Sequence, residues 1–412
     1  MGNTDVIACP GCDLHQAVGP LAPGGAALCG RCGDRLHRRP RRDPQYALAL
    51  VVTAVALFAV GNSFPLVVFE LAGHSQSGLL VSGVIALYRE GYWELAALVG
   101  FTTMVAPAAY LAGLFYVLLA QVRARRLPFL RQILRAVRGL TPWAMMEVYS
   151  LGILVAVVKL GDYGALVPGI ALAAFLCLAL LVVAINRDID EAALWRLAAA
   201  AGDGGNAAAL GSGVLWSCAV CGLLMRPLAG GAGARGDCPR CGSAVAPRKP
   251  DSLSRTWALL LAGFVLYIPA NLLPVMTIVS FGQQQTSTIL GGVIELAQAG
   301  MWPIAGIVFL ASIAIPVLKL VSLTLIAASV HWRWSWRPAE RTRLYRIVEG
   351  IGRWSMIDVF MVSILVALVN LGVLAQVEPD LGAAFFCAVV IITMFAASSF
   401  DPRLIWDDLE QE

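Results

Sequence analysis

Eight apolar stretches constrain the fold of this 412-residue chain more than any other feature. Each approaches or exceeds the roughly twenty helical residues needed to cross the hydrocarbon core of a bilayer. They lie at 46–69, 94–120, 143–160, 166–186, 257–281, 302–330, 354–374 and 381–399. Only 14% of the residues are charged, against about a quarter in soluble domains. The sequence therefore predicts a mainly α-helical, polytopic membrane protein.

The distribution of basic residues predicts the orientation of these spans. Of the 30 lysines and arginines, 27 lie in the C-terminal tail and in segments 31–45, 121–138, 187–256 and 331–353. Loops rich in Lys and Arg stay in the cytoplasm, so we expect these segments and both termini to be cytoplasmic. No cleavable signal peptide is expected, because the first apolar run is too long for one.

Eight of the ten cysteines form two copies of one pattern. Residues 9–32 and 218–241 each contain two Cys-x-x-Cys pairs separated by sixteen residues. Cytosolic thiols stay reduced, so the pairs indicate metal ligands rather than disulfides. The spacing is typical of a zinc ribbon, in which two tight knuckles complete a tetrahedral site. We predict two Zn²⁺ per chain, one held by Cys9, Cys12, Cys29 and Cys32 and the other by Cys218, Cys221, Cys238 and Cys241.

The composition of the knuckles refines this prediction. Four thiolates leave no open coordination position, which indicates a structural metal rather than a catalytic one. Iron in a rubredoxin-like site uses similar knuckles and is the alternative metal. A glycine, which favours a tight turn, follows three of the four knuckles, at Gly33, Gly222 and Gly242, and Asp13 follows the first. His15 lies near the first set of cysteines but is not needed as a ligand, and the same holds for His37.

The cysteine pattern recurs because the whole sequence repeats. A shift of 209 residues aligns GNSFP at 61–65 with ANLLP at 270–274, and two inserted residues then align 143–148 with 354–359 at a shift of 211. Four spans per copy return the chain to its starting side, so both copies share one orientation. The predicted fold is a tandem parallel repeat of four-helix transmembrane units, each preceded by a small zinc-ribbon module.

The repeat also predicts the domain boundaries. We expect a cytoplasmic zinc ribbon at 1–45 and a first transmembrane unit at 46–195. Residues 196–216 are small and polar and are interpreted as a flexible linker. A second cytoplasmic zinc ribbon at 217–256 and a second transmembrane unit at 257–412 follow.

Polar side chains inside the spans are the remaining candidates for function, because ionisable residues are costly in a membrane. Lys319 lies near the middle of 302–330, and Ser312 lies on the same helical face. Lys159 and Asp162 are three residues apart near the outer end of the third span and pair if that segment is helical. The alternative for Lys159 and Asp162 is interfacial snorkelling.

Two further features have structural interpretations. Asn62 and Asn271 are expected to satisfy backbone groups where the helices break before Pro65 and Pro274. Helix breaks at these prolines and at Pro107 and Pro316 are expected to hold an apolar groove open. The basic, aromatic-containing segments 121–139 and 331–353 either lie at the lipid surface or simply carry topogenic charge.

The chain resembles the paraquat-inducible protein A family. The resemblance is carried by two Cys-x-x-Cys ribbons, each heading a four-span unit, and by PVLKL at 316–320, and it covers nearly the whole chain. It implies a protein of the Gram-negative inner membrane that works with a periplasmic MCE-domain protein to move phospholipid between the inner and outer membranes. It also implies an intramembrane polar network at Lys159, Asp162, Ser312, Lys319, Ser355 and Thr393.

Enzymatic activity is not expected. The chain has no P-loop signature, and none of its four histidines lies within a span. No nucleic-acid partner is expected either. Two alternatives to lipid transport remain: a membrane scaffold whose ribbons recruit a cytoplasmic partner, and a membrane thiol or electron-transfer protein that uses its Cys-x-x-Cys pairs.

Overall fold

The helices and strands of the computed structural model occur twice in the same order, as the sequence repeat predicts. The structure describes residues 5–71, 74–160, 165–199, 215–226, 236–280, 283–368 and 375–407. Unit 1 contains α1 (Pro44–Ser63), β5 (Val67–Leu71), β6 (His74–Gly78), α2 (Leu80–Arg89), α3 (Trp93–Gly100), η1 (Phe101–Val105), α4 (Ala106–Val122), α5 (Leu130–Leu140), α6 (Met146–Leu160), β7 (Ala165–Pro168), α7 (Ile170–Arg187) and α8 (Glu191–Ala198). Unit 2 contains α9 (Ser252–Leu272), β12 (Met276–Ser280), β13 (Gln283–Ser287), α10 (Ile289–Gln298), α11 (Trp302–Phe309), η3 (Leu310–Ala314), α12 (Ile315–His331), α13 (Pro338–Ile351), η4 (Gly352–Met356), α14 (Ile357–Leu368), β14 (Ala375–Pro379), α15 (Leu381–Ser399) and α16 (Leu404–Asp407).

A small cysteine module precedes each unit. Module 1 contains β1 (Asp5–Ala8), β2 (His15–Val18), β3 (Ala26–Leu28) and β4 (Arg35–Arg38), paired as two antiparallel hairpins. Module 2 contains β8 (Trp216–Ser217), β9 (Leu224–Met225), β10 (Gly236–Asp237) and β11 (Ala244–Val245), paired in the same way. The predicted fold class, a tandem repeat of helical units each headed by a cysteine module, is confirmed.

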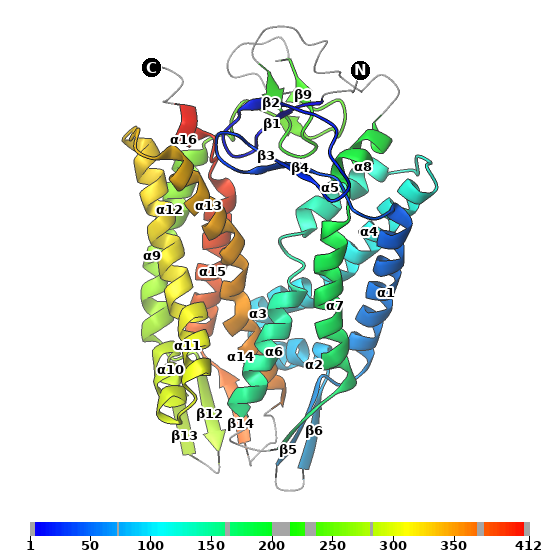
Figure 1. Cartoon of the computed structure of the whole chain (residues 1–412). Helices are drawn as coiled ribbons and strands as arrows, with labels where there is room; N and C mark the ends of the chain where they lie inside the picture. Colours follow the sequence, from blue (N-terminus) through cyan, green and yellow to red (C-terminus); the bar gives the residue numbers. More distant parts are fainter. Residues whose placement is uncertain are drawn as a thin grey trace.

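The two units point the same way. Each carries a three-stranded antiparallel sheet, with strand order β6-β5-β7 in unit 1 and β13-β12-β14 in unit 2. Figure 1 shows both sheets at one end of the molecule and both modules at the other. The first strand, β1, and the last helix, α16, lie at the modules' end (Figure 1). The repeat is therefore parallel, as four spans per copy require.

Seven helices within the described residues are long and apolar enough to cross a membrane. The third predicted span is not among them, because the described part of α6 comprises 15 residues. At 1.5 Å per residue this part is about 22 Å long, which is shorter than the hydrocarbon core of a bilayer. Its counterpart in unit 2 belongs to a continuous helical run over Pro338–Ala367.

A proline explains this difference between the units. Pro142 stands in unit 1 where unit 2 has Arg353. Proline lacks the N–H that a continuing helix needs, so the chain turns between α5 and α6. In unit 2 the equivalent segment is the 3₁₀ helix η4, which joins α13 directly to α14.

The prolines inside the second span of each unit do not break their helices. Pro107 and Pro316 lie at the starts of α4 and α12, each directly after a five-residue π-helix. The N–H of Ala106 donates to the carbonyl of Phe101, which widens the turn and lets the helix continue. The expectation of helix breaks at these two positions is wrong. Breaks do occur before Pro65 and Pro274, where α1 and α9 end.

The asparagines near those breaks have the predicted role. Asn62 Nδ2 donates to the carbonyl of Phe58 at 2.7 Å, and Asn271 Nδ2 donates to the carbonyl of Tyr267 at 2.9 Å. Each amide therefore donates to the backbone carbonyl four residues earlier, in the turn before the last turn of its helix.

Helices α6 and α14 join the two units at the centre of the molecule. A Cβ atom on Gly152 would lie 3.0 Å from Cβ of Phe360, and one on Gly83 of α2 would lie 2.7 Å from Oγ of Ser363. Small residues at these positions allow the close helix packing that is common in membranes. The rings of Tyr149 and Phe360 meet edge to face across the same interface, 5.4 Å apart.

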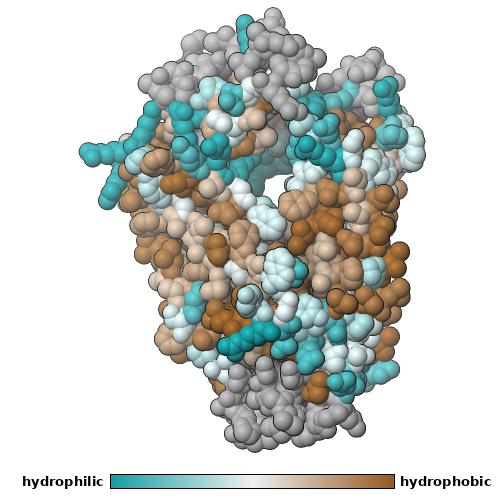
Figure 2. Space-filling view, turned by 180° about the vertical axis from the view of Figure 1, so that it is seen from behind, coloured by the Kyte–Doolittle hydropathy of each residue, from teal (hydrophilic) through white to brown (hydrophobic). Residues whose placement is uncertain are grey.

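The surface of the molecule is organised as expected for a membrane protein. Figure 2 shows a wide hydrophobic band across both units and hydrophilic side chains gathered toward the modules. The same view shows an opening between the two units on the modules' side of this band. The chain is a multi-pass membrane protein.

Candidate functional site

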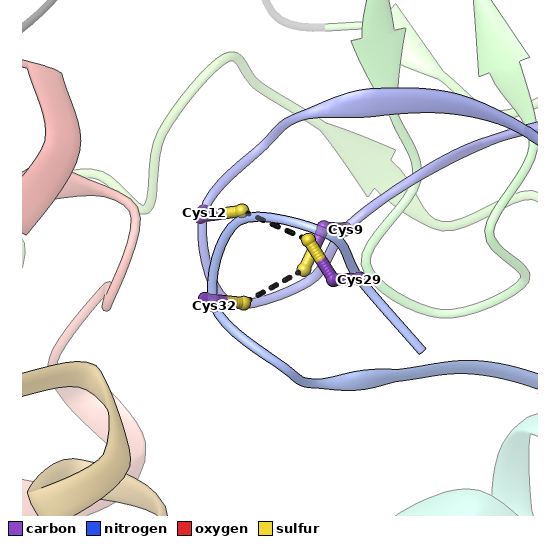
Figure 3. Close-up of side chains that lie close together, drawn as sticks. All are labelled: Cys9, Cys12, Cys29 and Cys32. Atoms are coloured by element: carbon purple, nitrogen blue, oxygen red, sulfur yellow. Dashed lines mark hydrogen bonds between the residues drawn. The ribbon is translucent and has the colours of Figure 1, made fainter. Parts of the chain in front are cut away.

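The four cysteines of each module come together in space. In module 1, Sγ of Cys9 lies 3.4 Å from Sγ of Cys32, and Sγ of Cys12 lies 3.5 Å from Sγ of Cys29 (Figure 3). The corresponding two distances in module 2 are both 3.5 Å. All four sulfurs of each module lie within 4.8 Å of one another, and all eight side chains are buried.

The backbone of each knuckle presents its sulfurs in the same way. The residue after each second cysteine is left-handed, with φ of 60° at Asp13, 70° at Gly33, 68° at Gly222 and 69° at Gly242. The N–H of this residue donates to the carbonyl of the first cysteine at 2.7–2.9 Å. Glycine adopts this conformation without strain, and Asp tolerates it better than most residues, which explains the residue types found there.

These donor sets fit a tetrahedral metal ion. With metal–sulfur bonds of about 2.3 Å, tetrahedral geometry places sulfurs about 3.8 Å apart. The observed separations are near this value and far beyond the roughly 2.05 Å of a disulfide. Among the described residues these are the groups of His, Cys, Asp and Glu that could hold a metal ion, and neither includes a histidine.

Each module docks on the unit that it does not precede. Module 1 packs against α13 and α16 of unit 2, in one buried cluster with Tyr345 and Trp406. Nη2 of Arg346 donates to the carbonyl of Cys32 at 2.8 Å, and Nη1 of Arg346 lies 3.2 Å from Oδ1 of Asp34. The guanidinium of Arg31 lies 4.4 Å from the ring centroid of Trp406.

Module 2 docks on unit 1 in the equivalent way. Its cysteines share a buried cluster with residues of α4, α5 and α8. Nη1 of Arg135 donates to the carbonyl of Gly242 at 3.1 Å, and Nη1 of Arg138 donates to the carbonyl of Val220. In the repeat, Arg135 and Arg346 occupy equivalent positions at a shift of 211 residues.

The basic segments 121–139 and 331–353 therefore have a role that the sequence did not reveal. Their helices α5 and α13 are docking platforms for the cysteine modules, and their arginines donate to knuckle carbonyls. Neither interpretation from sequence, a lipid-surface helix or plain topogenic charge, included this contact. The only sequence signal is an arginine at the same place in both copies.

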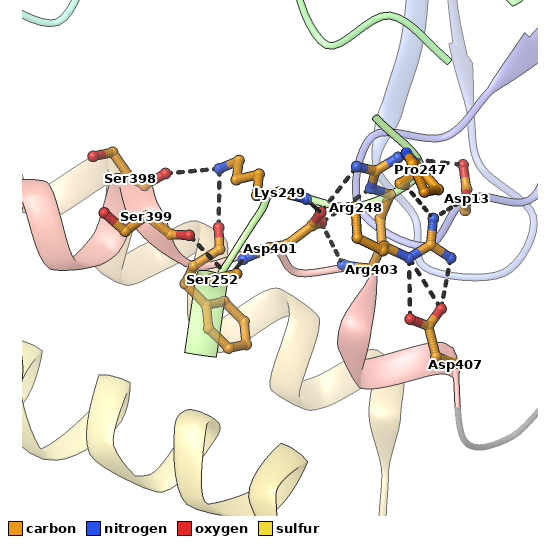
Figure 4. A network of polar contacts seen from close by, with 11 residues as sticks. Asp13, Pro247, Arg248, Lys249, Ser252, Ser398, Ser399, Asp401, Arg403 and Asp407 are labelled. Carbon is orange, nitrogen blue, oxygen red and sulfur yellow. Dashed lines mark hydrogen bonds and ion pairs between the residues drawn. The ribbon is translucent and has the colours of Figure 1, made fainter. Parts of the chain in front are cut away.

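A polar cluster fastens module 1 to the end of unit 2 (Figure 4). Arg248, which follows module 2, donates to Asp407 at 2.6 Å and to Asp13 of module 1 at 2.5 Å. Burial alone would lower the pKa of Arg248, but its hydrogen bonds to the two carboxylates raise that pKa above its usual value. Arg403 lies 3.9 Å from the same Asp13 and 2.9 Å from Asp401. The cluster thus joins both modules to the C-terminal helix.

Lys319 is buried in the middle of unit 2, with 3% of its surface exposed. Within the part of the chain that the structure describes, its Nζ has no hydrogen-bond partner. A Cβ atom on Gly352, the first residue of η4, would lie 2.9 Å from Nζ. Glycine at this position therefore makes the space that the amine occupies.

The other predicted polar residues fall into two groups. Ser312, Ser355 and Thr393 are buried on η3, η4 and α15, three elements that pack around α12. Ser312 donates to the carbonyl of Val308 at 2.6 Å, and Thr393 donates to the carbonyl of Val390 at 3.0 Å. Among the described residues, Oγ of Ser355 has no partner. Asp162 and the side chain of Lys159 lie outside the described residues.

The equivalent site in unit 1 lacks the amine. Tyr110 stands at the position of Lys319, and its hydroxyl donates to Oδ1 of Asn186 at 2.6 Å. Thr141 stands at the position of Gly352. The two units therefore share a backbone framework but differ in chemistry, and the unsatisfied amine belongs to unit 2.

An apolar cavity of about 40 Å³ lies between the units near the sheets' end. It is lined by Leu87 and Leu95 of unit 1 and by Val275, Met276 and Phe386, among others, of unit 2. Its volume accommodates only about three water molecules. A lipid tail entering here would have to displace side chains.

Comparison with known proteins extends these observations. A family model described as "Paraquat-inducible protein A" matches residues 45–199 and 253–410, one match in each unit. The chain is 35% identical to "Intermembrane transport protein PqiA" of Escherichia coli (strain K12), covering 97% of this chain and 95% of that protein. It is 30% identical to "Lipophilic envelope-spanning tunnel protein A" of the same strain, covering 98% and 91%. A "Probable intermembrane transport protein" of Haemophilus influenzae is 27% identical, covering 99% and 97%. No solved structure matches the chain.

Proposed function

The chain belongs to the paraquat-inducible protein A family, and on this premise we propose that it moves phospholipid between the inner and outer membranes. Its place is the inner membrane, and its partner is a periplasmic MCE-domain protein. The proposal is supported by relatives that are named for intermembrane transport and for a lipophilic envelope-spanning tunnel. The role is transport rather than catalysis.

The observation that carries the proposal is the buried amine of Lys319. An unpaired ammonium in a helix bundle is costly, so such groups mark pathways for substrates, ions or protons. A phospholipid carries an anionic phosphate, which an amine can bind when a path leads the headgroup to it. The side chains that line the cavity between the units are apolar, and they would have to move to admit a lipid tail.

Both alternatives fit the structure less well. A scaffold needs a free surface on its ribbons, but each module uses knuckle carbonyls to dock on the chain's own helices. A thiol or electron-transfer protein needs a reactive dithiol, and all eight module cysteines are buried. We propose that each four-cysteine group holds a structural Zn²⁺, which cross-links the two hairpins of its module.

The proposal is tested by reconstitution with vesicles. Donor liposomes that contain the chain should transfer labelled phospholipid to acceptor liposomes when the soluble region of the MCE-domain partner is added. Transfer should fall to background when either protein is omitted. Equal transfer from donor liposomes without the chain would contradict the proposed function.

The proposed orientation places the sheets in the periplasm and the modules in the cytoplasm, because 27 of 30 basic residues lie on the modules' side. Gln285→Cys, in the exposed part of β13, should react with a membrane-impermeant maleimide in cells whose outer membrane is permeabilised. Arg41→Cys, in the exposed segment after module 1, should react only after the inner membrane is lysed. The reverse pattern, read on the two peptides by mass spectrometry, would invert the orientation.

A further inference from the structure

Arg346 of α13 connects module 1 with the part of unit 2 that holds the buried lysine. On one side its guanidinium contacts the metal-binding module, through the carbonyl of Cys32 at 2.8 Å and the carboxylate of Asp34 at 3.2 Å. The module therefore contacts α13 through the last cysteine of its second knuckle and through Asp34, two residues further on. The hydrogen bond to Cys32 joins residues 314 positions apart in the chain.

The other side of the connection runs along α13. Gly352 follows the last residue of α13, six residues after Arg346, which is about 9 Å along a helix. Its Cα faces the amine of Lys319, because a Cβ built there would lie 2.9 Å from Nζ and 3.1 Å from Cε. A displacement of α13 would therefore change the wall against which the amine is packed.

Unit 1 has the equivalent docking contact, but it has no lysine at the position that corresponds to Lys319. Arg135 donates to the carbonyl of Gly242 as Arg346 does to Cys32, but the residue in the place of Lys319 is Tyr110. The hydroxyl of Tyr110 is satisfied by Asn186 at 2.6 Å. The docking contact of module 2 is thus connected with the hydrogen-bonded hydroxyl of Tyr110. That of module 1 is connected with the amine of Lys319, which has no hydrogen-bond partner among the described residues.

We propose that Arg346 is a positioning residue that couples module 1 to Lys319, so that the docked state of module 1 controls the polar site of unit 2. The coupling is crossed, because module 1 precedes unit 1 in the chain. It deepens the proposed transport role and rests on it only for the activity of Lys319. The docking of module 2 has no equivalent influence on an intramembrane charge.

The test is the reactivity of the Lys319 amine. The chain contains three lysines, Lys159, Lys249 and Lys319, so amine modification can be read on separate peptides by mass spectrometry. In the purified, metal-loaded protein, Lys319 should react slowly with a small N-hydroxysuccinimide ester because it is buried. In Arg346→Ala its rate should rise about tenfold, as expected when a local opening becomes ten times more populated. Lipid transfer should fall in the same variant.

Matched variants separate coupling from general damage. Arg135→Ala removes the equivalent contact in unit 1 and should leave both Lys319 reactivity and lipid transfer near wild-type values. Arg346→Lys keeps a charged donor near Asp34 and should restore part of the protection of Lys319. Zinc content is measured on every variant, and two zinc ions per chain should remain in Arg346→Ala. If the Ala variant loses its metal, Arg346→Met, which keeps the aliphatic stem but removes every N–H donor, decides the question instead.

Two outcomes would overturn the proposal. One is unchanged Lys319 reactivity in Arg346→Ala, or in Arg346→Met where the Ala variant loses its metal. The other is an equal rise in Arg135→Ala, which would indicate a general loosening of the protein. If only the transport role of Lys319 is wrong, the pattern is different. Lys319→Met then transfers lipid normally, while the reactivity of the Lys319 amine still rises in Arg346→Ala.

Discussion

Replacing Lys319 is expected to abolish lipid transport while the protein stays in the membrane at its normal level. The amine has no hydrogen-bond partner among the described residues, so its removal leaves no other group newly unsatisfied. Leaving a polar group buried and unpaired costs about 1–3 kcal/mol, and Lys319→Met would relieve this cost while filling similar space. Stability should therefore be unchanged or higher, although function is lost.

The measurement is complementation of a deletion strain together with quantification of the protein in the membrane. Tyr110→Phe is the matched control, because it removes the polar atom at the equivalent position of unit 1. It should retain most of the transport activity. Lys159→Ala and Asp162→Ala are predicted to abolish transport as well. Full complementation by Lys319→Met at normal protein level would show that the buried amine is not needed.

Lys319→Arg separates two roles for the amine. Arginine keeps its charge under all cellular conditions, whereas a lysine amine can release its proton. A site that anchors a phosphate should keep partial activity with Arg, and a site that relays protons should lose it. The space beside Gly352 is small for the larger guanidinium. The amount of Lys319→Arg in the membrane is therefore measured together with its transport activity.

Much of the architecture could be predicted because it depends on patterns that can be recognised in the sequence itself. Apolar length and basic loops depend on residues near one another in sequence, and the two copies align by direct comparison, so together these features predicted the repeat and its parallel sense. The cysteine spacing predicted which sulfurs come together, since two knuckles on two hairpins have few ways to meet. The position of Lys319 within an apolar run was sufficient to make it a candidate for function, whereas its burial between helices is known from the structure.

The crossed docking of the modules could not be predicted in this way. It depends on contacts such as that between Arg346 and Cys32, which lie 314 residues apart. An arginine on a basic helix has the same local pattern whether it faces lipid headgroups or a protein carbonyl. The same reasoning applies to Arg248, whose two carboxylate partners come from opposite ends of the chain.

The prolines affected the helices differently from what was expected, because the effect of a proline depends on the backbone that precedes it. Proline at 107 and 316 was expected to break the helix, but a preceding π-turn accommodates its missing N–H. Proline at 142 does end a helix, because no such turn precedes it there. The separation of α5 from α6 follows from this proline, since α13, η4 and α14 are continuous where unit 2 has Arg353.

Loss of one metal ligand is expected to have the largest effect on protein abundance. The wild-type chain should contain two Zn²⁺, and Cys29→Ser and Cys238→Ser should each contain one. The hairpins of each module have strands of only two to four residues, which cannot bury enough apolar surface to fold alone. Structural zinc contributes on the order of 10–16 kcal/mol of apparent binding free energy in small modules, so a module without metal should unfold.

The crossed docking predicts where the damage appears. Unfolding of module 1 in Cys29→Ser should expose the faces of Tyr345 and Trp406 in unit 2, and unfolding of module 2 in Cys238→Ser should expose Leu134 and Trp195 in unit 1. Limited proteolysis and hydrogen exchange should therefore report loss of protection on α13 and α16 in the first variant and on α5 and α8 in the second.

Cys177→Ser, at an exposed position of α7 outside the modules, is the control and should change neither zinc content nor protection. Elemental analysis that finds iron or no metal in the wild-type protein would refute the zinc assignment, and loss of protection on the unit that follows each mutated module would refute the crossed arrangement.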